Sequence, residues 1–151
     1  MANLQPQPVP SLYDLDFYHW TQTMAAALRQ GRWQELDPDN LAEEIESLGR
    51  SDKRALKHRL EVLLMHLLKW QYQPENRSNS WRATIVEQRL RILDLLDDSP
   101  SLKPYLEAEF ANGYTNACKL AVAETDLDAT AFPVQCPFTL KTVLTDGFLP
   151  H

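Results

Sequence analysis

Residues 41–73 read LAEEIESLGRSDKRALKHRLEVLLMHLLKWQYQ and carry the clearest structural signal in this chain. The run lies between Pro38 and Pro74 and contains no proline, a residue that helix interiors exclude. Its apolar residues recur in steps of four, three, four and three along one stripe: Leu56, Leu60, Leu63, Leu67 and Trp70. Because this is the period of a helix with one face in a core, we predict a long central helix.

The ten prolines of the chain mark the junctions between this helix and its neighbours. We expect five helical segments, at about 11–31, 37–73, 78–98, 101–125 and 137–147. Nowhere do apolar and polar residues alternate long enough to indicate a strand. The predicted fold class is therefore all-α: a single-domain helical bundle of about five helices around a central long helix, or around a helix pair if Gly49 divides the central segment.

Individual residues predict how these segments begin, end and pack. Ser11 is expected to cap the first segment and Gly31 to end it, and Asp37 with Pro38 is expected to open the second. Pro137 is expected to open the last one. The predicted core face of the first segment is Tyr13, Phe17, Trp20, Met24, Ala27 and Leu28. The fourth segment has small residues that permit close helix approach at Gly113, Ala117 and Ala121.

Length and composition place the chain among ordinary globular proteins. A chain of 151 residues with 44% hydrophobic residues can bury a core without disulfides or metal. We expect a flexible tail over residues 1–10 and one helical domain over 11–151. The longest apolar stretch, 62–68, is far shorter than the ~20 residues of a membrane span, so no membrane is expected. Two cysteines are too few for a disulfide framework and indicate a cytoplasmic protein.

Several strings of the sequence resemble those of a known family. They include SLYDLDFYHWTQ, LAEEIESLGRS, LLKWQYQPE and CPFTLKTVLTDGFLP, and the resemblance runs from Leu12 to Pro150. The family is the bacterial one catalogued as domain of unknown function twenty-nine. The resemblance implies an all-helical bacterial protein of a kind common in cyanobacteria. It implies no activity and no catalytic residue, so the cofactor stays unknown.

One polar cluster is a candidate for chemistry. Glu44, Ser51 and His58 follow at intervals of seven, and His66 lies eight residues further on. Carboxylates and histidines facing the interior of a bundle can build metal or acid–base sites, although the paired Glu-x-x-His motifs of di-iron proteins are absent. The alternative is that His66 is a core histidine bonded to a neighbouring helix, because a buried polar group needs a partner. We favour the second interpretation and predict no metal ligands.

A basic band is the second candidate. Residues 1–49 carry a net charge of -6, residues 50–91 carry +6, and the remainder carries -6. Nucleic-acid phosphates are the anions such a band would bind, through the candidate residues Arg50, Lys53, Arg54, Lys57 and Arg82. The acidic flanks can instead neutralise the band, within the bundle or across a dimer. The overall charge of -6 disfavours nucleic acid as a partner.

A third candidate is Cys136, which would be a reactive thiolate if Pro137 opened a helix directly after it. No phosphate-binding glycine loop or recognised catalytic motif is present. We therefore expect a non-enzymatic interaction or assembly protein whose partner is another protein or a second copy of itself. The first alternative is a metal-dependent or acid–base enzyme that uses Glu44, His58 and His66. The second is a nucleic-acid-associated protein that uses the basic band.

Overall fold

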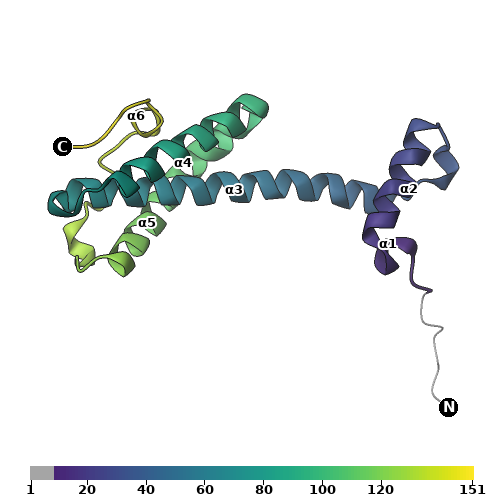
Figure 1. Ribbon diagram of the computed structural model, residues 1–151, viewed down its shortest axis with the longest axis horizontal. Helices are drawn as coiled ribbons and strands as arrows, with labels where there is room; N and C mark the ends of the chain where they lie inside the picture. The colour runs from purple at the N-terminus through teal and green to yellow at the C-terminus, as the bar shows by residue number, and fades with distance from the viewer. Residues whose placement is uncertain (1–8) are drawn as a thin grey trace, which may run out of the picture. The chain divides into compact units, whose positions relative to one another are not determined.

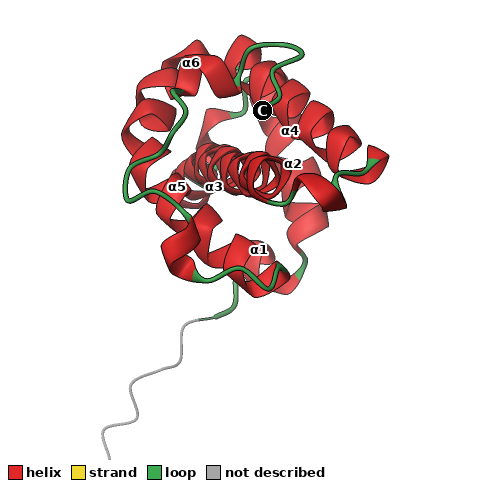
Figure 2. Ribbon diagram, turned by 90° about the vertical axis from the view of Figure 1, so that its left-hand side faces the viewer, coloured by secondary structure: helices red, strands yellow, loops and turns green. Residues whose placement is uncertain are grey.

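The computed structural model describes residues 9–151, and residues 1–8 of the predicted tail lie outside this range. Within the described range, six α-helices and four short 3₁₀ helices occur and no strand (Figure 2), which confirms the all-α class. The chain divides into two compact units, one ending at Leu48 and one comprising Gly49–His151. The single helical domain over 11–151 stays a prediction.

The first unit begins with two helices where the sequence indicated one. Helix α1 spans Leu12–Leu15 and α2 spans Phe17–Arg29, followed by the 3₁₀ helix η1 at Trp33–Glu35. The break falls at Asp16, whose backbone is not helical and whose side chain accepts a hydrogen bond from the His19 N–H. An aspartate can satisfy a free N–H of the first helical turn, so it starts a new helix. Gly31 ends this part of the chain with a φ of 69°, as expected for a glycine after a helix.

The core of the first unit is small. Trp20, Met24 and Ala27 are buried, as predicted. Phe17 and Leu28 were also predicted to be buried, but they are 50% and 45% exposed. The Phe17 ring stacks on Trp20 with centroids 5.8 Å apart, so it covers the indole from outside and does not fill the interior.

Helix α3 spans Pro38–Tyr72 without interruption, so Gly49 does not split it. Asp37 caps its start, because the Asn40 N–H donates to Asp37 Oδ1 at 3.4 Å. No atom of residues 9–151, apart from the chain neighbours and the helix's own backbone, lies within 4 Å of the position that a Cβ on Gly49 would take. A single glycine weakens a helix without necessarily breaking it, and the turns on both sides of Gly49 are helical.

The second unit forms around the C-terminal part of α3, against which α4 (Asn79–Asp98) and α5 (Lys103–Glu124) both pack (Figure 1). All five residues of the predicted stripe are buried, and its four leucines have no exposed surface. Gly113 on α5 allows a close approach to α3, because a Cβ there would lie 3.0 Å from Leu60 Cδ2. The short 3₁₀ helices η2 (Pro74–Asn76) and η3 (Pro100–Leu102) make the connections before α4 and α5.

The C-terminal segment contains η4 (Ala129–Ala131) and the short helix α6 (Leu140–Val143). The prediction that Pro137 opens this helix is wrong. Thr139 caps it, because the Thr139 side chain accepts a hydrogen bond from the Thr142 N–H. The segment is held to α4 by Arg89, which is 3% exposed and donates to the carbonyls of Val143 and Phe148, each at 2.8 Å.

Candidate functional site

Glu44, the first residue of the predicted polar cluster, has a structural partner within the first unit. It is half-buried on α3, and its carboxylate accepts a hydrogen bond from the Tyr13 hydroxyl. This bond raises the pKa of Tyr13 to about 12, because removing the tyrosine proton would place two negative charges side by side. Glu44 therefore joins α1 to α3.

The two histidines of the cluster lie apart. His58 is exposed, whereas His66 is half-buried, and burial lowers the pKa of His66. They are eight residues apart on α3, which corresponds to about 12 Å along a helix axis. The Nδ1 atom of His66 lies 2.9 Å from the Val62 carbonyl oxygen, so its partner belongs to its own helix and not to the neighbouring helix that we predicted. Among the described residues, no group of three or more histidine, cysteine, aspartate or glutamate side chains could hold a metal ion.

The candidate anion-binding residues also occupy two separate places. Arg50, Lys53 and Arg54 are exposed and Lys57 is half-buried, all on α3. The Lys53 ammonium lies over the Tyr105 ring at 5.1 Å from its centroid. Arg82 lies on α4, with its guanidinium 5.5 Å from the Trp70 ring centroid. Trp70 follows Lys57 by thirteen residues, about 20 Å along α3, so the structure does not bring Arg82 to the other four.

A cluster of cations and tryptophans that sequence reasoning missed lies where α3 ends and α4 begins. Lys69 is only 7% exposed, and its Nζ forms an ion pair with Glu124 at 2.8 Å and lies 4.5 Å from the Trp81 ring centroid. Arg77 lies over Trp70 at 5.1 Å and donates from Nε to the Trp70 carbonyl oxygen. The Lys69 pair supports the interpretation that acidic flanks neutralise part of the basic band. The sequence feature that could have indicated this cluster is the position of Lys69, a cation inside the apolar run LLKW.

The cysteines do not form a nucleophile site. Cys136 lies four residues before α6, so it is not at a helix N-terminus. Burial raises the pKa of both thiols, Cys118 and Cys136. A raised pKa keeps a thiol protonated at neutral pH, and the protonated form is a poor nucleophile. The structure therefore gives no support to a reactive thiolate at Cys136.

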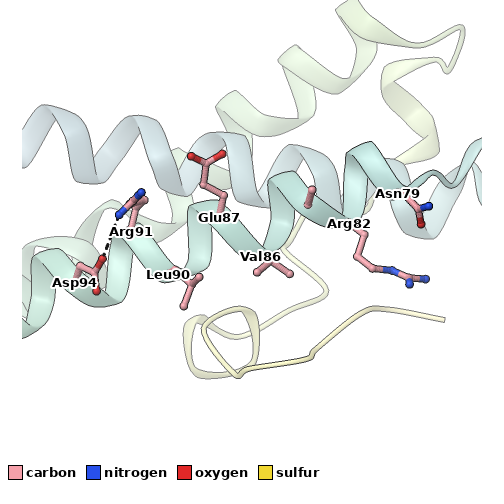
Figure 3. Close-up of a pocket in the computed structure, with 8 residues that line it drawn as sticks. Asn79, Arg82, Val86, Glu87, Leu90, Arg91 and Asp94 are labelled. Atoms are coloured by element: carbon pink, nitrogen blue, oxygen red, sulfur yellow. Dashed lines mark ion pairs between the residues drawn. The ribbon is translucent and has the colours of Figure 1, made fainter.

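The outward face of α4 carries a shallow groove with a volume of about 680 Å³. Figure 3 shows its lining, which comes entirely from α4: Asn79, Arg82, Ala83, Val86, Glu87, Leu90, Arg91 and Asp94. Val86 and Leu90, which are 44% and 53% exposed, lie along one edge of it, and charged side chains make up much of the remaining lining. The apolar period of α4 could be predicted from the sequence, but no pattern in the sequence indicated that this face is open.

Exposed apolar side chains are unevenly distributed. Within residues 9–151, twelve large hydrophobic side chains are exposed, and eight of them belong to the first unit: Val9, Leu15, Phe17, Tyr18, Leu28, Trp33, Ile45 and Leu48. The second unit contributes Val86, Leu90, Leu120 and Val134. In the described part of the chain, none of the helices combines the length and the apolar character needed to cross a membrane.

Comparisons with known proteins identify a family and nothing further. The model of the family described as "Domain of unknown function DUF29" matches residues 12–149, nearly the whole chain. Neither a curated protein nor a solved structure matches the chain. The family match confirms the resemblance noted from the sequence strings, and its description assigns no activity.

Proposed function

This chain belongs to the DUF29 family, whose description names no activity, and we propose that it is a non-enzymatic protein that assembles with copies of itself through the first unit. The proposal includes a bacterial cytoplasmic location. Two cysteines are fewer than small secreted proteins use for a disulfide framework, and the cytoplasm keeps thiols reduced.

The observation that carries the proposal is the ratio of exposed to buried apolar side chains in the first unit. Eight large hydrophobic side chains are exposed there, while the buried residues among those described are Trp20, Met24 and Ala27. Large exposed apolar surfaces are uncommon on proteins that act alone, so such an excess of exposed over buried apolar side chains favours association.

Ile45 and Leu48 illustrate what association would gain. They lie three residues apart on α3, so they point to the same side of the helix, and they are 68% and 70% exposed. Fully burying a fully exposed side chain of this kind contributes roughly 1.5–3 kcal/mol, and each of these two, being partly covered already, contributes less than that. A symmetric dimer uses each side chain twice, which doubles the benefit.

The alternative functions have less support from side-chain placement. A metal-dependent or acid–base enzyme needs its ligands or proton-transferring groups to converge, yet His58 and His66 are about 12 Å apart along α3. A nucleic-acid site needs a continuous basic surface, yet Arg82 lies against Trp70, whose position on α3 is about 20 Å along the helix from that of Lys57. Association through apolar side chains requires neither arrangement.

Sedimentation equilibrium of the purified full chain tests the proposal. We expect the wild type to form species larger than the 17.4 kDa chain at micromolar concentrations. A variant with both Ile45→Glu and Leu48→Glu should lose the association through the first unit, because each copy would bring two charges into the apolar contact. Its helix content should not change, since both positions are exposed.

Val134→Glu is the matched control. Val134 is 99% exposed in the second unit, so this variant adds a charge at an apolar position without touching the first unit. It should associate like the wild type. A wild-type chain that stays monomeric up to about 100 µM, or a double variant that associates as strongly as the wild type, would refute the proposal.

A further inference from the structure

The outward face of α4 has a second arrangement of apolar and charged side chains, which is independent of the first unit. Its inward residues Ile85 and Ile92 have no exposed surface, and Arg89 is fixed by its hydrogen bonds to the C-terminal segment. These contacts determine which side of α4 faces the solvent. The groove residues from Arg82 to Asp94 therefore form a defined face, about 18 Å long.

This face has two different edges. In Figure 3, Val86 and Leu90 point to one edge of α4, while Glu87 and Arg91 point to the opposite edge. Both pairs have i, i+4 spacing, so each pair forms a short row along the helix. One edge is apolar, and the other carries one negative and one positive charge.

We propose that a second copy of this chain docks on this groove through its own α4, with the two helices antiparallel and related by a two-fold axis beside residues 88–89. This axis exchanges the two members of each row. Val86 then meets Leu90 of the second copy, and Glu87 meets Arg91 of the second copy. Because the interface is isologous, each contact occurs twice.

The charges at the ends of the groove follow the same symmetry. Arg82 lies near one end and Asp94 near the other, and the midpoint of their positions is residue 88. An antiparallel second copy therefore brings its Asp94 to the end where Arg82 lies. Opposite charges then meet along the charged edge and near the ends of the groove, and such complementarity sets the orientation of a partner.

A parallel arrangement does not have this match. A two-fold axis along the helix direction would place the charged edge of one α4 against the apolar edge of the other. Glu87 and Arg91 would then be partly desolvated beside Val86 and Leu90, and unpaired charges in an apolar contact are unfavourable. The antiparallel dimer is the arrangement that pairs like edge with like edge.

The existing partner of Arg91 does not prevent this pairing. Arg91 Nη1 lies 3.7 Å from Asp94 Oδ2, and the two side chains are 58% and 65% exposed. An exposed ion pair at this distance contributes little to stability. Arg91 can leave this ion pair and turn to Glu87 of a second copy at small cost. Asp94 can then pair with Arg82 of that copy.

The inference extends the proposed assembly role to a second surface, and it uses no residue of the first unit. Its test is sedimentation equilibrium of the full chain carrying Ile45→Glu and Leu48→Glu, so that association through the first unit is absent. We expect this protein to remain in a monomer–dimer equilibrium. Adding Leu90→Glu should abolish the dimer, and Leu120→Glu, at a 40% exposed position on α5, should not.

A charge exchange provides the sharper measurement. Glu87→Arg should weaken dimerisation roughly tenfold or more, because two like-charge contacts replace two attractive ones. Combining Glu87→Arg with Arg91→Glu should restore the wild-type dissociation constant, since opposite charges then meet again. A simple loss of folding would not be rescued in this way, and circular dichroism at 222 nm checks that all variants keep their helix content.

Two results would overturn the inference. One is a chain that stays monomeric at about 200 µM in the Ile45→Glu, Leu48→Glu background, which would leave the groove to an amphipathic helix of another protein. The other is a double charge exchange that does not restore the dimer. The proposed function is refuted by a different result: association that stays unchanged when only Ile45 and Leu48 are replaced.

Discussion

Adding one methyl group to Gly113 tests how closely α5 approaches α3. Gly113 is buried within α5, and a Cβ there would lie 3.0 Å from Leu60 Cδ2 and 3.4 Å from Leu60 Cγ. The same change at Gly49 meets no atom within 4 Å among the described residues outside its own stretch of helix backbone. Both glycines lie inside helices, so Gly113→Ala and Gly49→Ala form a matched pair that differs in packing alone.

Two contributions determine the expected change in the free energy of unfolding. Alanine is favoured over glycine in a helix interior by about 1 kcal/mol, and this gain applies at both positions. Overpacking a core typically costs 1–3 kcal/mol, and this loss applies only at position 113. Leu60 has no exposed surface, so its methyl group cannot move away into solvent. We expect Gly49→Ala to stabilise by about 0.5–1 kcal/mol and Gly113→Ala to destabilise by up to about 2 kcal/mol.

Urea unfolding followed by circular dichroism at 222 nm measures both changes. For a chain of this size, 1 kcal/mol corresponds to about 2–4 °C in melting temperature, so thermal unfolding gives an independent reading. The result that refutes the reasoning is a Gly113→Ala variant as stable as Gly49→Ala. It would mean that α5 and α3 separate easily at this contact.

Three further predictions concern other contacts. Leu63→Ala should lower the free energy of unfolding by about 2–5 kcal/mol in urea titrations, through lost contacts and a residual cavity; a loss below about 1 kcal/mol would contradict its core position. Arg89→Met should lower the free energy of unfolding by about 2–4 kcal/mol and speed up hydrogen exchange in the C-terminal segment, because two carbonyls lose a charged donor. Unchanged exchange would argue against the role of Arg89 in holding this segment to α4. Tyr13 should stabilise the first unit fully below pH ~10 and lose this contribution as the pH rises through 12, since its pKa is raised in the folded state. Circular dichroism from pH 9 upward should then show an alkaline loss of helix that Tyr13→Phe lacks.

The long central helix could be predicted because one physical pattern repeats over many turns. Leu56, Leu60 and Leu63 keep the same spacing, and every member of the stripe is buried in the structure. The small residues of α5 gave a second correct signal, since Gly113 does permit close contact with Leu60. Periodicity works here because each helix buries one continuous face.

Helix ends were predicted less well because they depend on single hydrogen bonds. Asp16 and Thr139 each cap a helix that the sequence pattern started elsewhere. Several residues near each boundary have side chains able to cap, and the sequence does not state which one adopts the required backbone conformation. Phe17 and Leu28 were misassigned for a related reason: the first unit has few elements to cover them, so helical period alone overstates their burial.

The candidate sites could not be predicted from spacing, because spacing along one helix does not create convergence. His58 and His66 share α3 but are separated along its axis, and the buried cation Lys69 acquires its carboxylate partner from a residue 55 positions away. The groove on α4 depends on a similar non-local fact. Val86 and Leu90 become an exposed apolar edge only because Ile85, Arg89 and Ile92 are occupied by the core and by the C-terminal segment. The charges at 87 and 91 can complement those of a second copy only because this orientation of α4 leaves them on the solvent side. A surface that pairs with its own copy is thus a property of the folded unit, and mutations of the inward residues should change association as well as stability.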